Sequence, residues 1–390
     1  MSSYKRNPSL MLAYCFLRYF MFFIPIFTPF LLGEGLTYSQ IFMIHFTFGI
    51  SVLVLEIPVG YLTDRIGRKR ALFIGSIIMA SALFMYGSVI GFWLFVLAEF
   101  VLAIGFSFYS GTYQALLYDS LLHLKKEKLY KKWAGYALAF QRGAEIIASF
   151  LVSFIVVFGM KYTFYFSMVP LLISLPVIFL MKEPKIKKEP VGIGHWHHFG
   201  KVVKDAYNHP AIFWFSMYFA VFTGTMLTGI WLFQSLWTEY EIALVSFGLL
   251  WVALQVFSGS GSLSAHYLEK KLGLHFSLVI IIILLFLGII LSAILPSPYS
   301  LITMCLCMFL WGFSVPVSHD AVNKLVVSSR RATVLSFKSM LMRVFHTIFT
   351  LLVAVVLVSF SLSFSLILLA GIFLVISGFS LYKLHDHGVL

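Results

Sequence analysis

Charged side chains are scarce in this sequence of 390 residues. Asp, Glu, Lys and Arg together make up 11% of it, whereas apolar residues make up 61%, and the mean hydropathy is +0.96. So little polar surface cannot coat a water-soluble globule, which excludes a soluble fold and indicates a lipid environment. Because a membrane-spanning helix uses about 20 apolar residues, this length accommodates about twelve spans.

Cysteine is scarce as well, and the motifs of common enzyme classes are absent. Cys15, Cys305 and Cys307 all lie in apolar runs, without the spacing of a disulfide framework or a metal site, and are interpreted as packing residues. The sequence has no nucleotide-binding loop, no H-E-x-x-H helix and no G-x-S-x-G elbow. We therefore expect neither an enzyme nor a bound cofactor.

The basic residues are spread over the loops rather than gathered on one face. The formal net charge is +13, but nucleic-acid binding would need a single basic surface, so we expect no nucleic-acid partner. Nearly all of the loop Lys and Arg fall in alternate loops, and Lys161 is the exception. Because basic loops stay cytoplasmic, we predict a multi-pass protein of a bacterial inner membrane with both termini cytoplasmic.

Twelve apolar runs divide into two groups of six. The predicted spans are 9–31, 38–61, 71–90, 92–121, 133–158 and 163–181, followed by 210–236, 243–265, 276–295, 299–321, 333–360 and 363–382. This pattern predicts an N-terminal half (1–181), a basic cytoplasmic linker (182–209) and a C-terminal half (210–390). The linker contains His195, His197 and His198, but with no thiolates nearby it is interpreted as a solvated loop, so no metal site is expected.

The two halves repeat one pattern weakly. Span two ends in LEIPVGYLTDRIGRKRAL, and span eight ends in SGSLSAHYLEKKLGLHFSL at the matching place. Such an echo fits six-helix halves related by an axis along the membrane normal, with the solute site near the midplane between them.

The loop after span two carries the most specific motif. Residues 60–72 read GYLTDRIGRKRAL, which closely resembles the G-x-L-x-D-R-x-G-R-K-x-x-L loop of major facilitator superfamily (MFS) transporters. The resemblance implies an all-α polytopic membrane fold of about twelve helices in two halves around a central cavity. It also implies a charge network that latches the two halves in one access state. The implied latch residues are Gly60, Asp64, Arg65, Gly67, Arg68 and Asp119, with a far side near residues 331–333; alternatively, these charges only anchor the topology.

Two departures from that family weaken an inference of export. Proton-driven exporters of the family often carry an arginine in helix four, where this sequence has Glu99. Many also carry G-P-x-x-G-G in helix five, whereas this helix reads GYALAFQRGAEIIAS.

Ionisable residues within the spans are functional candidates, because each is costly at bilayer depth. They are Arg18, His45, Glu56, Glu99, Arg142, Glu145, His319, Asp320, Lys338, Arg343 and His346. The family architecture implies a substrate site made of Arg18, Glu99, Tyr109, Tyr113, Gln114, Arg142, Gln234 and Arg343. Its arginines favour an anionic solute, since guanidinium matches carboxylate or phosphate, although arginines near helix ends can simply snorkel.

Three carboxylates are candidates for proton coupling. Glu99, Glu145 and Glu56 qualify if desolvation brings their protonation equilibrium into the working range. Arg142 and Glu145 lie three residues apart on one helix face, where they can instead neutralise each other. Each histidine, taken alone, is interpreted as a buried hydrogen-bonded residue.

The sequence thus predicts a secondary active transporter working by alternating access, with protons as the coupling ion. Its solute is expected to be a small organic molecule, anionic or amphipathic, such as a siderophore, an organic acid or a drug. Export and import both remain open, and a receptor or assembly protein that kept the fold is a third reading. The expected partners are the solute, protons and the lipid bilayer, and the small loops favour a monomer.

Overall fold

A computed structural model of the chain describes residues 4–184, 209–325 and 331–388. Within the helices Tyr299–Leu325 and Arg331–Val356, the side chains of residues 319, 322–325, 331–333, 335 and 336 are not described. The linker histidines His195, His197 and His198 therefore lie outside the described residues. The far side of the predicted latch, residues 331–333, is described in its backbone only.

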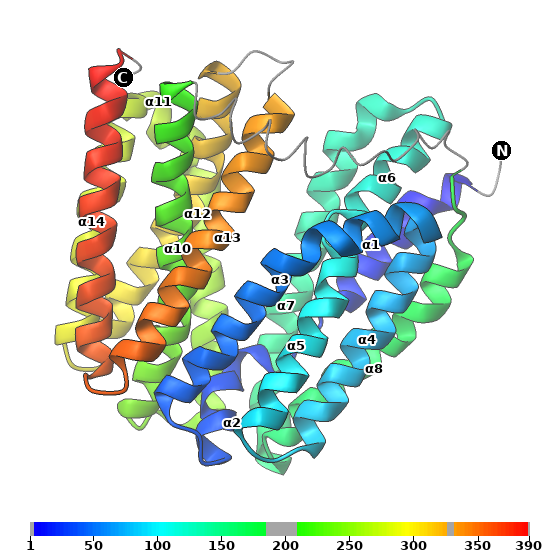
Figure 1. Ribbon diagram of the computed structural model, residues 1–390, viewed down its shortest axis with the longest axis horizontal. Coiled ribbons are helices and arrows are strands. Elements are labelled where there is room, and N and C mark those ends of the chain that lie inside the picture. The colour runs from blue at the N-terminus through cyan, green and yellow to red at the C-terminus, as the bar shows by residue number, and fades with distance from the viewer. Residues whose placement is uncertain (1–3, 185–208, 326–330, 389–390) are drawn as a thin grey trace. The chain divides into compact units, whose positions relative to one another are not determined.

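All regular structure in the described ranges is helical (Figure 1). The α-helices are α1 (Asn7–Arg18), α2 (Phe27–Gly33), α3 (Tyr38–Ile66), α4 (Arg68–Ser88), α5 (Phe92–Tyr109), α6 (Thr112–His123), α7 (Tyr130–Ile155), α8 (Lys161–Leu180), α10 (Pro210–Glu239), α11 (Phe247–Ile294), α12 (Tyr299–Leu325), α13 (Arg331–Val356) and α14 (Leu362–Asp386). Five short 3₁₀ helices join or extend them: η1 (Tyr4–Arg6), η2 (Ile24–Ile26), η3 (Glu127–Leu129), η4 (Val156–Phe158) and η5 (Leu244–Ser246).

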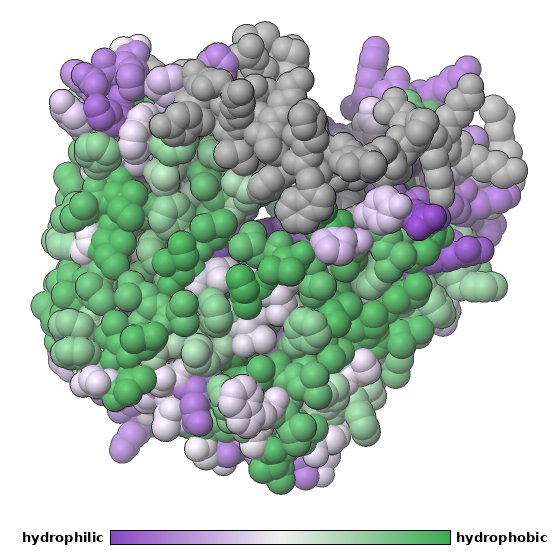
Figure 2. All heavy atoms as spheres, viewed as in Figure 1, coloured by the Kyte–Doolittle hydropathy of each residue, from purple (hydrophilic) through white to green (hydrophobic). Residues whose placement is uncertain are grey.

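By length and composition, these helices are sufficient for twelve membrane crossings within the described residues. Ten helical segments are long and apolar enough to cross a bilayer, and one of them, Leu244–Ile294, holds two crossings because Gly273 interrupts its helical backbone. The remaining crossing is the broken pair α1 and α2. Figure 2 shows hydrophobic side chains over the bodies of the helices and hydrophilic ones at their ends, the pattern that lipid requires. The predicted all-α polytopic fold is confirmed.

The chain forms two compact units. The first unit comprises residues 1–37, 47–191 and 243–251, and the second comprises 38–46, 192–242 and 252–390. Helices α3 and α11 each belong to both units: α3 begins in the second and continues into the first, and α11 does the reverse. The predicted linker 182–209 stays a prediction, because most of it lies outside the described residues.

In the first unit, α4 packs against α5 and α8, and α1 packs against α7 and α8. Gly75 and Gly105 let α4 and α5 approach closely: a Cβ on Gly75 would come 2.7 Å from the Cβ of Phe108. In the second unit, α10 lies alongside α13 and α14 (Figure 1). Gly224 has the same role there, since its Cβ would come 2.8 Å from the Cβ of Phe345 on α13.

The weak sequence echo between the halves corresponds to one backbone feature in each unit. Gly67, between α3 and α4, has φ 95° and ψ 149°, and Gly273, within α11, has φ 78° and ψ 163°. Both positive φ values favour glycine, and a helix begins directly after each residue. The turn is thus repeated, although the charges of the first motif are not.

Candidate functional site

The first membrane crossing is broken, and the break positions Arg18. The sequence predicted one continuous span over residues 9–31, but α1 ends at Arg18, and helix resumes only at η2 and α2. Pro25 lies in the first turn of η2. Because proline lacks an N–H, it cannot continue the hydrogen bonding of α1, whereas at the start of a helix that N–H is not needed. One freed N–H, that of Phe22, donates to Ser167 Oγ at 2.9 Å. Broken helices at membrane depth are found where they line a protein cavity or a binding site.

Arg18 is buried at this break, and no acidic partner lies beside it in the ranges that the structure describes. Its side chain is 2% exposed, and none of the ion pairs among the described residues includes it. The Nη1 atom lies 3.9 Å from Met21 Sδ, and Nε has no hydrogen-bond partner. A buried guanidinium normally requires a carboxylate or several acceptors, so its donors are available to an anion.

Three aromatic rings surround the Arg18 guanidinium. Its Cζ lies 4.6 Å from the ring centre of Tyr109, 5.5 Å from that of Tyr19 and 5.9 Å from that of Phe106. Cation–π contacts of this kind partly compensate a desolvated cation and leave its in-plane N–H groups unused. They hold the guanidinium in place without neutralising it.

A second helix break lies beside the first. The predicted span 92–121 is divided into α5 and α6 at Ser110 and Gly111, and Gly111 has φ 73°. Tyr109 ends α5 and Tyr113 lies in the first turn of α6; their rings stack with centres 4.7 Å apart. Gln141 on α7 donates to the Tyr109 hydroxyl at 3.1 Å. The structure therefore brings Arg18, Tyr109 and Tyr113 together, and it adds Tyr19, Phe106 and Gln141, which sequence reasoning missed.

Glu99 lies elsewhere in the first unit. It precedes Tyr109 by ten residues on α5, which corresponds to about 15 Å along a helix. Its side chain is 5% exposed, and the hydroxyl of Tyr86 on α4 donates to Oε2. Tyr86 stacks on Phe164 and Phe95, so Glu99 is part of an aromatic core and not of the Arg18 cluster.

Arg142 and Glu145 pair with each other, as their spacing allowed. Arg142 Nη1 donates to Glu145 Oε2 at 2.9 Å, and the Arg142 side chain is 55% exposed. Trp251, at the start of α11 and in the same unit, donates from Nε1 to Glu145 Oε1 at 3.3 Å. Gln114 and Glu56 both lie at exposed positions, on α6 and α3 respectively.

The second unit contributes Gln234, Arg343 and a buried lysine. Gln234 on α10 is fully buried, and Arg343 lies midway along α13. Lys338, on α13 and 8% exposed, donates to Ser318 Oγ at 2.8 Å and lies 5.5 Å from the ring centre of Phe219. Among the residues that the structure describes, no cluster of His, Cys, Asp and Glu could hold a metal ion.

A comparison of the sequence with models of known protein families identifies the family of this chain, and the helical architecture is consistent with it. The profile of the Major Facilitator Superfamily matches residues 10–350. The chain belongs to the Major Facilitator Superfamily. It is therefore a multi-pass integral membrane protein and a secondary transporter, which confirms the family inferred from the GYLTDRIGRKRAL loop.

Solved structures of other transporters share the fold of this MFS chain. A single-residue mutant of the nucleoside transporter NupG superposes with a TM-score of 0.78 at 15% identity, covering 98% of this chain and 99% of the other. A second NupG structure gives 0.72 at 16%, covering 98% and 99%. A bacterial homologue of the human lysosomal transporter Spinster, inward-facing and unoccupied, gives 0.74 at 13%, covering 98% and 97%. At such identities the likeness shows the fold alone. A comparison with curated proteins finds no match.

The MFS loop forms a charged network at one end of the first unit. Arg68 forms an ion pair with Asp119 and donates from Nη1 to the carbonyl of Ala115 at 2.8 Å. Asp64 and Arg65 are exposed, and Asp64 lies close enough to Arg68 for their charges to interact. Two of the predicted latch residues, Arg68 and Asp119, are thus directly joined.

Glu183 completes this network and was missed by sequence reasoning. Its carboxylate accepts the backbone N–H of Arg68 at 2.9 Å and that of Lys69 at 2.7 Å, which caps the N-terminus of α4. Next to it, the Asn7 side chain accepts the N–H of Lys182 at 2.9 Å and donates to its carbonyl at 2.7 Å. The only signal in the sequence was an acid directly after the sixth apolar run.

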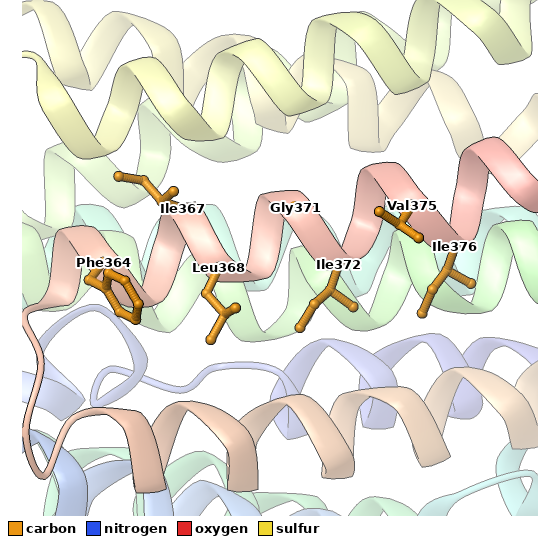
Figure 3. A pocket seen from close by; sticks show the side chains of 7 residues that line it. All are labelled: Phe364, Ile367, Leu368, Gly371, Ile372, Val375 and Ile376. Carbon is orange, nitrogen blue, oxygen red and sulfur yellow. The ribbon is translucent and has the colours of Figure 1, made fainter.

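A groove of about 490 Å³ runs along α14. Figure 3 shows its lining, which consists of Phe364, Ile367, Leu368, Gly371, Ile372, Val375 and Ile376. None of these side chains can donate or accept a hydrogen bond, so the groove cannot orient a polar solute. An apolar helix face of this kind suits contact with lipid tails.

Proposed function

We propose that this MFS protein moves a small anionic organic solute by alternating access, coupled to protons, with Arg18 as the residue that binds the anion. The observation that carries the proposal is the buried Arg18 guanidinium, which has no acidic partner among the described residues and lies where two membrane helices are broken.

The surroundings of Arg18 narrow the class of solute. A carboxylate or phosphate would take the two in-plane donors that the aromatic rings leave unused. The faces of Tyr19, Phe106 and Tyr109 add apolar surface, and Tyr113 and Gln141 add polar groups for a second point of contact. This combination supports an amphipathic anion, such as an aromatic carboxylate or a carboxylate siderophore. Arg142, Gln234, Arg343 and Gln114 remain proposed substrate contacts that act at other stages of the cycle.

Glu99 is the proposed carrier of the coupling proton. It is buried among aromatic side chains, and Tyr86 is its hydrogen-bond donor. Neither an arginine nor a lysine forms an ion pair with it among the described residues, so its charge is not fixed by a partner. Glu145 is the second candidate, although Arg142 and Trp251 already engage both of its oxygens. Glu56 is the third, at an exposed position on α3.

The remaining features of the proposal concern topology and gating. Both termini and the GYLTDRIGRKRAL loop are proposed to face the cytoplasm of a bacterial cell, and the protein is proposed to work as a monomer. Asp64, Arg65, Arg68 and Asp119, with Gly60 and Gly67 shaping the turn, are proposed to latch one access state. The Glu183 cap supports this assignment, because it ties the start of α4 rigidly to the end of the sixth span.

The test begins with a panel of solutes on purified full-length protein. Thermal shift and then flux in proteoliposomes under an imposed pH gradient would be measured for carboxylate siderophores, aromatic and aliphatic organic acids, nucleosides and lipophilic cations. We expect anions to stabilise the protein and to be transported. The direction of proton-driven flux then distinguishes an exporter from an importer.

Three arginine variants make this test specific. Arg18→Gln should abolish anion binding, and Arg18→Lys, which keeps the charge but not the planar pair of donors, should weaken it about tenfold. Arg70→Gln, at an exposed position outside the proposed latch, is the matched control and should bind normally. The anion assignment would be refuted if only nucleosides or lipophilic cations raise the melting temperature and are transported, and if Arg18→Gln leaves both effects unchanged. Binding without flux of any solute would favour a receptor that kept the fold.

A further inference from the structure

The segment of residues 19–23, which joins α1 to η2, contributes to the surroundings of Arg18 and belongs to no helix. The ring centre of Tyr19 lies 5.5 Å from the Arg18 Cζ, and Met21 Sδ lies 3.9 Å from its Nη1 atom. The environment of the guanidinium therefore depends on the conformation of this segment.

Helix α8 holds the segment at two neighbouring positions. The backbone N–H of Phe22 donates to Ser167 Oγ at 2.9 Å. Three residues earlier on α8, Phe164 stacks on Phe23, with ring centres 5.1 Å apart and an angle of 21° between the rings. Because the segment lacks the regular hydrogen bonds of a helix, contacts of this kind determine its course.

Phe164 is the centre of a buried aromatic cluster. We define this cluster as Phe23, Phe27, Phe30, Tyr86, Phe95 and Phe164, all of which are at most 6% exposed. The Phe164 ring centre lies 4.5 Å from that of Phe30 and 5.2 Å from that of Tyr86. Tyr86 also meets Phe27 edge-on at 5.4 Å.

The cluster contacts the chain on both sides of the helix break. Phe23 lies directly before η2, and Phe27 lies directly after it. Because protein interiors are close-packed, a ring of this cluster cannot shift without displacing its neighbours. A movement of Tyr86 is therefore passed to Phe164 and Phe27, and through them to the segment of residues 19–23.

Glu99 acts on the cluster through Tyr86, whose hydroxyl donates to its Oε2. Among the described residues, Tyr86 on α4 is the titratable group that acts on Glu99. The side chains that α2, α5 and α8 place against Tyr86 are the phenylalanines of the cluster. A hydrogen bond to an ionised carboxylate is about twice as strong as one to a neutral group. Protonation of Glu99 therefore weakens the bond that holds the Tyr86 ring.

We propose that Tyr86 is a positioning residue that transmits the protonation state of Glu99 to residues 19–23, and thereby to Arg18. When Glu99 is ionised, the charge-assisted bond fixes Tyr86, the cluster is ordered, and the segment is held against α8. When Glu99 takes up a proton, this bond weakens, the rings of Tyr86 and Phe164 gain freedom, and the segment loosens.

This inference rests on the proposed function and deepens it, because it states how the proton carrier affects the anion site. Glu99 precedes Tyr109 by ten residues on α5, or about 15 Å, and Arg18 lies beside Tyr109. The two charges are therefore too far apart for an ion pair, and the aromatic contacts span the distance between them. Since coupling between two binding events is reciprocal, an anion that orders the segment also changes proton binding at Glu99.

The experiment follows the segment itself and needs no solute. Hydrogen–deuterium exchange of the full-length protein in lipid nanodiscs would be measured by mass spectrometry at pH 8.5 and pH 5. Labelling times would be scaled to the intrinsic exchange rate at each pH. The readout is the protection of amides in peptides that cover residues 19–30, which reports local opening. Loss of the charge on Glu99 should lower this protection about fivefold at pH 5.

Three variants decide the outcome. Glu99→Gln is neutral at both pH values and should show the low protection at both. Tyr86→Phe keeps the ring in the cluster but removes the hydroxyl, so its protection should not depend on pH. Tyr165→Phe is the matched control, because the Tyr165 hydroxyl bonds to the carbonyl of Gly87 at 2.6 Å and not to Glu99. It should respond like the parent protein.

The proposal is overturned if the parent protein has the same protection at both pH values. It is also overturned if Tyr86→Phe or Glu99→Gln retains the full response, or if Tyr165→Phe loses it. Each variant is compared with itself at two pH values, so a uniform loss of stability does not imitate the response. Because no solute is present, these results do not depend on the solute panel, and failure of the panel leaves the exchange measurement valid.

Discussion

Replacing Arg18 by methionine should make the solute-free protein more stable. Arg18 is buried and has no acidic partner in the part of the chain that the structure describes. Replacing buried charged groups by apolar side chains of similar size can stabilise a protein by about 1 to 4 kcal/mol. The substitution also removes cation–π contacts, which together contribute about 1 to 2 kcal/mol when desolvated. The midpoints of these ranges leave a net gain of about 1 kcal/mol. For a chain of 390 residues, this corresponds to a rise in melting temperature of about 1 °C.

Arg142→Met is the matched comparison and should have the opposite sign. Arg142 neutralises the buried carboxylate of Glu145 at 2.9 Å, so its removal weakens the balance of a buried charge. Because the Arg142 side chain is more than half exposed, solvent screening limits the loss to about 1 kcal/mol. The two arginines thus look alike in the sequence and should differ in the sign of their effect.

The assay is thermal unfolding of purified protein without solute, followed by intrinsic fluorescence or a thiol-reactive dye. Arg18→Met should melt higher than the parent and should lose any anion-dependent shift, which is the pattern of a residue kept for binding at the expense of stability. A lower melting temperature for Arg18→Met would show that Arg18 holds the fold together. That result would refute the hypothesis that the Arg18 N–H donors bind an anionic solute.

Three further outcomes are expected. Glu99→Gln should abolish accumulation driven by a pH gradient while sparing solute exchange in proteoliposomes, because the amide still accepts from Tyr86 but carries no proton; unchanged pH dependence would transfer the coupling role to Glu145 or Glu56. Asp64→Asn should reduce flux at least tenfold with an unchanged melting temperature, and normal turnover would remove it from the latch. Glu183→Gln should lower stability by about 1 kcal/mol through loss of a charge-assisted helix cap. Glu127→Gln, at an exposed position in η3, is the control and should melt like the parent.

The number of crossings followed from the sequence because lipid imposes a simple rule. Each span must satisfy its backbone internally and present about 20 apolar residues, so apolar runs and the loops between them are visible in one dimension. The loop GYLTDRIGRKRAL is equally local, since all of its positions lie in one turn and the adjoining helix ends. Fold class and family were therefore accessible without coordinates.

The helix breaks after Arg18 and at Gly111 coincide with helix-breaking residues in the sequence. An average of hydropathy over a window does not detect such residues. Pro25 and the Ser110-Gly111 pair interrupt helices, yet the surrounding residues remain apolar, and a window of 20 residues averages them away. The spans 9–31 and 92–121 were consequently predicted as continuous. Both interruptions lie beside the Arg18 cluster.

Which charges are neutralised was decided by tertiary packing. Arg142 forms an ion pair with Glu145 because both lie on one face of α7. Their spacing of three residues is enough to predict this pair. Arg18 contacts aromatic rings of α5, and Glu99 accepts a hydrogen bond from a tyrosine of α4. These neighbours come from other helices, so the sequence around each residue does not predict them. The sequence by itself determined that the chain is a multi-pass membrane protein and belongs to a transporter family, since both properties depend on contiguous residues. Only the tertiary structure decided which arginine is left without an acidic partner among the described residues, because that property depends on contacts between helices far apart in the chain.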